Sequence, residues 1–259
     1  MLKLGDRMKQ YETVTTAQRF RQEDIVIARL DGRSFSSFTR SLKKKGPFYS
    51  GFTETMKAVT LHLVEAYNPA IGYTQSDEIT LVFINGQKSE HPFGGRVFKI
   101  QSLMAADASV YFGSLLPIYM PEKVGTQPVF DCRCFTVPSS KEAYECIVWR
   151  RQDGYRNAVS TVAREYFSDK ELHGKPKEEQ LSMLTSKGVN FQASIDPVYQ
   201  HGTCYARIAE SRVFTAEELS TLPPKHQAHS NPDLSYLRHV VKEVPFEDVE
   251  KFIENTNKS

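Results

Sequence analysis

The chain has 259 residues, enough to bury a core without disulfide or metal support, and its 33 Lys and Arg against 31 Asp and Glu leave a net charge of +2. Composition alone therefore does not identify a nucleic-acid binder, although local Lys and Arg clusters could still neutralise phosphates. No stretch approaches the ~20 apolar residues that a membrane span needs. Four cysteines without C-x-x-C spacing and the absence of an apolar leader indicate a reduced, cytoplasmic protein.

The predicted elements begin with an apolar, β-branched strand over residues 25–30, which stops at Asp31-Gly32. Apolar residues at helical spacing then predict a helix over Ser50–Tyr67. Two short strands follow, AIGYTQ and ITLVFI, and the three residues Ser76-Asp77-Glu78 between them indicate a tight hairpin.

A second helix over residues 96–116 and a strand in PVFDCRCFTV complete the order β-α-β-β-α-β. This is the pattern of ferredoxin-like sheets and of polymerase palms. The predicted fold class is therefore α+β, an antiparallel palm sheet with helices on one face, followed by a C-terminal appendage of helices and a β-hairpin. The two expected domains are a palm-like core over residues 1–138 and the appendage over residues 139–259, packed on it.

Within the appendage, Ser139 and Glu142 predict a capping box that opens a long helix over residues 140–167. The segment FQASIDPVYQHGTCYARI is interpreted as a β-hairpin that turns near His201-Gly202. Residues 223–235, rich in Pro, His, Ser and Asn, are interpreted as a loop, and a last helix is expected to start near Pro245.

Two carboxylates are placed by this topology at one edge of the sheet. In a β-α-β-β-α-β sheet the first strand lies beside the third, so the end of strand one meets the hairpin between strands two and three. Asp31 follows the first strand and Asp77 lies in that hairpin, and we expect them to converge. Convergent carboxylates suit Mg²⁺, and two such ions clamp the attacking and leaving oxygens of phosphoryl transfer. Taken singly, each acidic residue is also typical of an ordinary turn.

The loop after Asp31 offers a glycine for close backbone approach and several N–H groups that could hold a triphosphate. It matches no Walker pattern. Lys43, Lys44 and Lys45 lie within reach as positive charges. Two thiols, Cys132 and Cys134, are interpreted as buried residues and not as half of a zinc site, because no second pair completes four ligands.

Several segments occur in this order along the chain: GDRMKQYE, RLDGRSFSSF, GYTQSDEITLVF, the R-x-x-K of Arg96 and Lys99, DCRCF and EAYECIVWRRQD. Together they resemble the tRNA-His guanylyltransferase family and its Thg1-like branch, which extend RNA in the 3′-to-5′ direction. The resemblance implies a nucleotidyltransferase that uses two Mg²⁺ ions, ATP and GTP, with tRNA as substrate, and a homotetramer.

By match to the family, Asp31, the Gly32 carbonyl and Asp77 would hold the two metal ions, with Glu78 as an additional catalytic carboxylate. The resemblance implies that the nucleoside triphosphate is bound by Gly32, Arg33, Ser34, Phe35, Ser36, Lys44, Lys45 and Ser76. It assigns a second triphosphate or the RNA 5′ end to Arg96 and Lys99. Contacts with RNA or with another subunit are expected of Arg150, Asp153, Asn157 and Lys187, although the first three are equally typical of a solvated helix face.

One departure from the family pattern distinguishes its branches. Members that add one extra guanosine to tRNA-His carry H-I-N-N-L-Y-N after the W-R-Q-x-D segment, whereas this chain reads Y-R-N-A-V-S-T and keeps only the first asparagine, Asn157. That difference favours template-dependent repair of truncated tRNA 5′ ends over untemplated addition of one guanosine.

Two other classes remain open at this stage. A palm-type nucleotidyl cyclase would also use two carboxylates and magnesium, but the basic pair Arg96/Lys99 and the W-R-R-Q-D helix supply more charge than one triphosphate needs. A non-catalytic RNA-recognition domain shares the topology, but DCRCF does not match its aromatic signature. Trp149 is interpreted as a core anchor, in preference to a surface on which bases stack.

Overall fold

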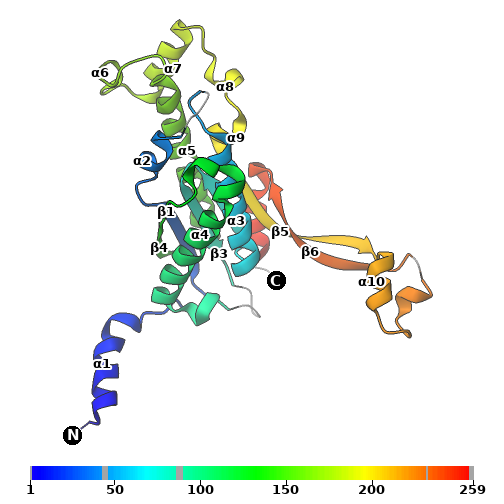
Figure 1. Ribbon diagram of the computed structural model, residues 1–259. Coiled ribbons are helices and arrows are strands. Elements are labelled where there is room, and N and C mark those ends of the chain that lie inside the picture. Colours follow the sequence, from blue (N-terminus) through cyan, green and yellow to red (C-terminus); the bar gives the residue numbers. More distant parts are fainter. Residues whose placement is uncertain (1, 43–45, 86–89, 232, 257–259) are drawn as a thin grey trace.

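A six-stranded antiparallel sheet lies at the centre of the molecule, with its strands in the order β4-β1-β3-β2-β5-β6 (Figure 1). The computed structural model describes residues 2–42, 46–85, 90–231 and 233–256. The strands are β1 (Ile25–Gly32), β2 (Ile71–Gln75), β3 (Glu78–Phe83), β4 (Phe130–Val137), β5 (Thr203–Val213) and β6 (Ser235–Val244).

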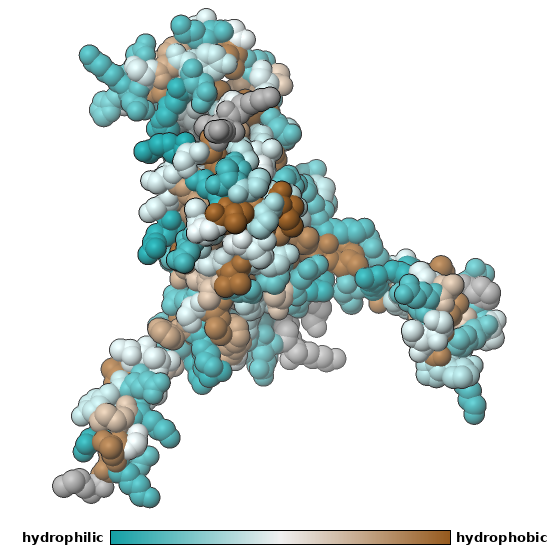
Figure 2. Space-filling view, in the orientation of Figure 1, coloured by the Kyte–Doolittle hydropathy of each residue, from teal (hydrophilic) through white to brown (hydrophobic). Residues whose placement is uncertain are grey.

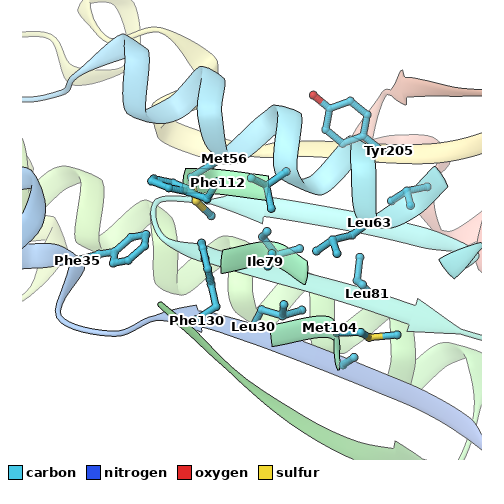
Figure 3. Close-up of a cluster of buried hydrophobic side chains, with 14 of the residues drawn as sticks. Leu30, Phe35, Met56, Leu63, Ile79, Leu81, Met104, Phe112, Phe130 and Tyr205 are labelled. Atoms are coloured by element: carbon cyan, nitrogen blue, oxygen red, sulfur yellow. The ribbon is translucent and has the colours of Figure 1, made fainter. Parts of the chain in front are cut away.

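The two helices expected in the palm lie on one face of this sheet. They are α3 (Ser50–Tyr67) and α4 (Val97–Tyr119), and Asn68, with a φ of 53°, ends α3 in the left-handed conformation. The side chains that α3 and α4 bury against β1 and β3 form the main core (Figure 3). Each fully buried Leu, Ile or Phe contributes roughly 1.5–3 kcal/mol. The predicted α+β palm is confirmed.

The opposite face is covered in part by α5 (Ser140–Ala163) and α11 (Val249–Thr256). The Ser139 side chain caps α5 by accepting a hydrogen bond from the Glu142 N–H at 3.2 Å, which is one of the two bonds of the predicted capping box. The second half of α5 leaves the sheet and packs in a separate lobe with the short helices α7 (Lys177–Ser186) and α8 (Phe191–Ser194).

Other short elements complete the chain. The α-helices are α2 (Phe35–Arg40), α6 (Asp169–Leu172), α9 (Pro197–His201) and α10 (Ala216–Thr221), and the 3₁₀ turns are η1 (Pro92–Gly95), η2 (Pro121–Lys123), η3 (Gln227–His229) and η4 (Phe246–Asp248). The N-terminal helix α1 (Leu4–Thr16) projects from the body and buries none of its side chains (Figure 1). Its apolar residues appear as brown patches on this projection in Figure 2.

The predicted hairpin around His201-Gly202 is wrong. The first half of that segment forms α8 and α9, because Asn190 and Asp196 cap these helices through their side chains and Pro197 occupies the first helical position of α9. The second half is β5, whose long antiparallel partner β6 lies beyond the loop predicted over residues 223–235. The two strands extend the palm sheet beyond β2 and then project from it (Figure 1).

Strand β1 continues through Asp31 to Gly32, beyond the expected end at residue 30, and two helix ends also differ from the prediction. Helix α4 continues to Tyr119, because Pro117 is accommodated inside the helix, and α5 ends at Ala163, four residues before the expected end at 167. Among the described residues, no helix is both long and apolar enough to cross a membrane.

Candidate functional site

Three acidic side chains lie side by side across the end of the sheet. Asp31 on β1 is in register with Asp131 on β4 and with Glu78 on β3, so the three residues project from the same face. We call this set the acidic row. Asp77 immediately precedes Glu78, in the turn between β2 and β3, and its carbonyl oxygen accepts a hydrogen bond from the Gly32 N–H at 3.1 Å. The structure thus brings Asp31, Gly32, Asp77 and Glu78 together.

The acidic row perturbs its central member. Partial burial raises the pKa of the Asp31 carboxyl above its usual range, and the charges of Asp77, Glu78 and Asp131 raise it further. Among the described residues, Arg133 opposes them, with its guanidinium 3.9 Å from the Asp31 carboxylate. A cation placed among these carboxylates would reverse the perturbation.

Glu78 differs from the other acids because its charge is already compensated. The Arg150 Nε donates to its carboxylate at 2.6 Å, and the Arg29 Nε lies 3.9 Å from it. Arg150 also donates to Asp153 at 3.0 Å. Helix α5 is therefore tied to the acidic row through Glu78, which leaves Asp31 and Asp77 as the acids with the greater need for a cation.

Two serines next to these acids have unusual backbone conformations. Ser34 follows β1 with a φ of 60°, and Ser76 begins the β2–β3 turn with a φ of 55°. A non-glycine residue in this region is uncommon, and such strain often accompanies a functional site. The Ser76 hydroxyl lies 3.1 Å from the Asp77 carboxylate.

Gly32 is required by close packing. A Cβ atom on Gly32 would lie 2.5 Å from the ring of Phe35, which folds back beneath it into the aromatic core. The side chain of Phe35 is 2% exposed, so only its backbone N–H could face a nucleotide. Arg33, Ser34 and Ser36 are exposed around it. Lys43, Lys44 and Lys45 lie outside the described residues.

A cavity of about 340 Å³ opens beside this loop. Ser36, Ser76 and Asn157, from three separate segments, all line it, together with Gln75 at the end of β2. Its walls are largely aromatic and aliphatic, and they include Phe48 and Tyr199, whose rings stack at 4.4 Å. A cavity of this size and character suits a small flat ligand.

Arg96 and Lys99 lie at the opposite end of the palm in the same chain. The backbone of Arg96 forms an isolated antiparallel β-bridge with Arg19, and the Phe20 N–H donates a hydrogen bond to the Gly95 carbonyl. These contacts place the start of α4 near the beginning of β1. The acidic row lies at the other end of that strand, roughly 20 Å away. Lys187 follows α7, and its ammonium lies 5.5 Å from the ring centre of Phe167.

Four residues without a site role in the sequence prediction lie in the acidic row or next to it. Asp131 belongs to that row, and Arg133 and Arg29 are in register with each other one step further along the strands. The fourth is Trp149, whose interpretation as a core anchor is wrong: it is 49% exposed and contacts both Arg29 and Arg150. Polar residues at alternate positions of DCR and RLD were the available signal, since strands alternate faces.

Among the described residues, no three His, Cys, Asp or Glu side chains are grouped as a complete metal-ligand set. Cys132 and Cys134 are free thiols whose sulfur atoms lie 3.8 Å apart. A metal at the acidic row would therefore need ligands beyond protein side chains, which is how Mg²⁺ binds when substrate phosphates and water complete its shell.

Comparison with known families identifies the chain. The profile of the Thg1 family, described as tRNAHis guanylyltransferase, matches residues 5–138, which include β1, the β2–β3 hairpin and β4. The chain belongs to the Thg1 family. The recognition made from the sequence is confirmed, and the family's activity is that of a nucleotidyltransferase.

Individual relatives agree with this membership. A protein of Acanthamoeba polyphaga mimivirus named uncharacterized protein R259 is 30% identical over 220 residues, 76% of this chain and 74% of the viral protein. A probable tRNA(His) guanylyltransferase of Dictyostelium discoideum is 28% identical over 150 residues, 53% of this chain and 56% of that protein. The structure of a bacterial Thg1-like protein in complex with ATP has a TM-score of 0.72 and 26% identity, and covers 80% of this chain and 87% of its own.

Proposed function

We propose that this protein adds nucleotides to the 5′ end of tRNA in the 3′-to-5′ direction, guided by the base on the opposing strand, and thereby repairs truncated 5′ ends. The observation that carries the proposal is the meeting of Asp31 and Asp77 at one sheet edge, next to a cavity lined by Ser36, Ser76 and Asn157. A phosphate group at the carboxylates and a base in the cavity would be adjacent.

Two Mg²⁺ ions would bind at this edge, held by Asp31, Asp77 and the Gly32 carbonyl. The three acidic neighbours of Asp31, which together with its partial burial raise its pKa, support a site that needs positive charge. When bound, such ions neutralise the charge on the transferring phosphoryl group and the oxygens on either side of it. Glu78, tied to Arg150 and Arg29, would keep the hairpin that carries Asp77 in place.

The nucleotide would lie between the Gly32–Ser36 loop and the β2–β3 turn. The N–H groups of Ser34, Phe35 and Ser36 precede the first hydrogen bond within α2, which Ser37 donates, and are therefore available to triphosphate oxygens. Ser76 and Asn157 would contact the nucleotide from the other side of the cavity, and Lys44 and Lys45 are expected to add positive charge. The ATP complex of the bacterial neighbour supports a nucleoside triphosphate as substrate.

The reaction proceeds in two phosphoryl transfers. The RNA 5′-monophosphate first attacks ATP, which forms a 5′-linked adenylate and releases pyrophosphate. The 3′-hydroxyl of the incoming GTP then attacks that 5′ phosphate and displaces AMP. Positioning and charge neutralisation suffice for both steps, so no protein nucleophile is needed.

A homotetramer would explain the position of Arg96 and Lys99. Because these residues lie about the length of β1 away from the acidic row of their own chain, we propose that they bind a triphosphate or RNA 5′ phosphate at the site of another copy. The same arrangement would let Arg150, Asp153, Asn157 and Lys187 contact an RNA that spans subunits. A cytoplasmic location, where tRNA and reduced thiols occur, remains a prediction.

The decisive experiment measures 5′ extension directly. The protein is incubated with MgCl₂, ATP, GTP and a tRNA transcript that lacks its first 5′ nucleotide, with either C or A opposite the missing position. We expect extension with C opposite and little with A, and no extension by Asp31→Ala or Asp77→Ala. Equal addition opposite both bases would instead support the untemplated guanylyltransferase, and a cyclic nucleotide formed without RNA would support the cyclase.

A further inference from the structure

The face of the sheet next to the acidic row is only partly covered by helices. Helix α5 contacts β1, β2 and β4, yet the side chains of Asp131, Arg133 and Phe135 on the edge strand β4 stay exposed on that face. They lie at alternate positions of the strand and are in register with Asp31, Arg29 and Ile27. Along β4 this exposed face is therefore acidic next to the site, then basic at Arg133, and aromatic at Phe135.

Trp149 lies beside this open face. Its ring contacts Arg29, whose guanidinium carbon is 5.5 Å from the ring centre, and Arg150, at 4.4 Å. Both arginines are also held by Glu78 of the acidic row. Although it has these two neighbours, the tryptophan is still 49% exposed, and Phe135 on the same open face is 37% exposed.

The spacing between Trp149 and the carboxylates matches one nucleotide. Arg29, which contacts the indole, is two positions before Asp31 on β1, a separation of about 7 Å along the strand. An RNA whose 5′ phosphate lies at Asp31 would thus have its first base at the level of the indole. Exposed aromatic rings beside arginines are the usual surface on which proteins stack unpaired or terminal bases.

We propose that Trp149 stacks against the 5′-terminal base of the RNA substrate, while Arg29 and Arg133 face the phosphates next to it. The inference rests on the proposed function and identifies Trp149 as the residue that positions the 5′ end of the RNA for that reaction. Stacking is indifferent to base identity, which suits an enzyme that must accept any 5′-terminal nucleotide and leaves selection to the opposing strand.

The chain offers a direct optical test, because Trp149 is its only tryptophan. The intact protein is titrated, with MgCl₂ and without nucleotides, with a tRNA acceptor-stem hairpin bearing a 5′-monophosphate. A second hairpin, identical except for an abasic 5′-terminal residue, is the matched ligand. We expect the first RNA to quench tryptophan fluorescence strongly and the abasic RNA to quench it little, and ATP or GTP alone to leave it unchanged.

Variants test the same inference through kinetics. Trp149→Ala should raise the KM for RNA about 10-fold, the size of one lost base–aromatic stack, with a much smaller change in kcat, while Trp149→Phe should retain most of the affinity. Tyr166→Ala removes an aromatic residue of similar exposure, 48%, outside this face and should leave the KM unchanged. Thermal unfolding of each variant shows whether the fold is intact.

Two results would overturn the inference while the proposed function stands. One is equal quenching by the intact and abasic RNAs, and the other is an unchanged KM for Trp149→Ala in an enzyme that extends RNA. Failure of the unmodified protein to extend any RNA would instead count against the proposed function, and the quenching experiment, which needs no turnover, would still decide whether Trp149 stacks on the RNA end.

Discussion

Replacement of Asp31 by asparagine is predicted to stabilise the metal-free protein while it abolishes activity. Asp31 is in register with Glu78 and Asp131, and directly opposed residues have side chains about 5 Å apart. Coulomb's law gives about 3 kcal/mol of repulsion for each such pair at an effective dielectric constant of about 20. Because the Asp31 side chain is 42% exposed, solvent screening reduces this to roughly 1 kcal/mol per uncompensated neighbour.

Glu78 is already paired with Arg150, and Asp131 with Arg133 at 3.4 Å, so Asp77 is the acidic neighbour whose charge counts most. The Asp31→Asn variant should therefore gain about 1 kcal/mol of unfolding free energy in EDTA, and Tm should rise by roughly 2–4 °C. MgCl₂ should raise the Tm of the unmodified protein by binding the folded state, but should raise that of the variant far less.

The assay is thermal unfolding of both proteins in EDTA and in MgCl₂, repeated at high salt, where the difference in EDTA should shrink. Asp153→Asn is the matched control, because Asp153 is paired with Arg150 at 3.0 Å and with Arg156 at 2.5 Å and its neutralisation should destabilise the protein. Loss of stability in Asp31→Asn, or an equal response of both proteins to MgCl₂, would refute the reasoning.

Three further predictions concern pH and packing. Since the pKa of Asp31 is raised, the metal-free folded state binds more protons than the unfolded state between the ordinary aspartate pKa and the raised one. The free energy of unfolding should therefore fall as pH rises through this range. Urea titrations at several pH values should show that Asp31→Asn removes this dependence. Gly154→Ala should cost about 1–3 kcal/mol, because its Cβ would lie 2.0 Å from the Gln75 side chain, and no change in the urea midpoint would contradict this. Phe35→Ala should cost about 3–5 kcal/mol by the same assay, since Phe35 is 2% exposed among Phe52, Phe112 and Phe130.

The palm could be predicted from the sequence because its signals are local. Strand β1 and helix α3 are marked by hydrophobic periodicity, and the two-residue turn between β2 and β3 fixes their pairing. Those elements already place Asp31 beside the hairpin that carries Asp77. Strand β6 was missed because its partner β5 lies more than twenty positions earlier, and nothing in a local pattern shows such long-range pairing.

The open face around Trp149 could not be predicted for a related reason. A tryptophan that follows two apolar residues in a helix is usually buried, and the exposure of Trp149 depends on how far α5 extends over the sheet, which is set by tertiary packing. Asp131 and Arg133 alternate with cysteines in β4, a pattern that gives two faces but does not say which of them meets the acidic residues.

The most direct test of the central claim is a count of bound divalent cations. Mn²⁺ is titrated into the intact protein with GTP present, and free Mn²⁺ is followed by electron paramagnetic resonance. We expect about two protein-dependent Mn²⁺ ions per chain, beyond those that GTP alone binds, in line with a two-metal site, and loss of both in Asp31→Asn and Asp77→Asn. Unchanged Mn²⁺ binding in these two variants would show that the carboxylates at this sheet edge do not hold the metal.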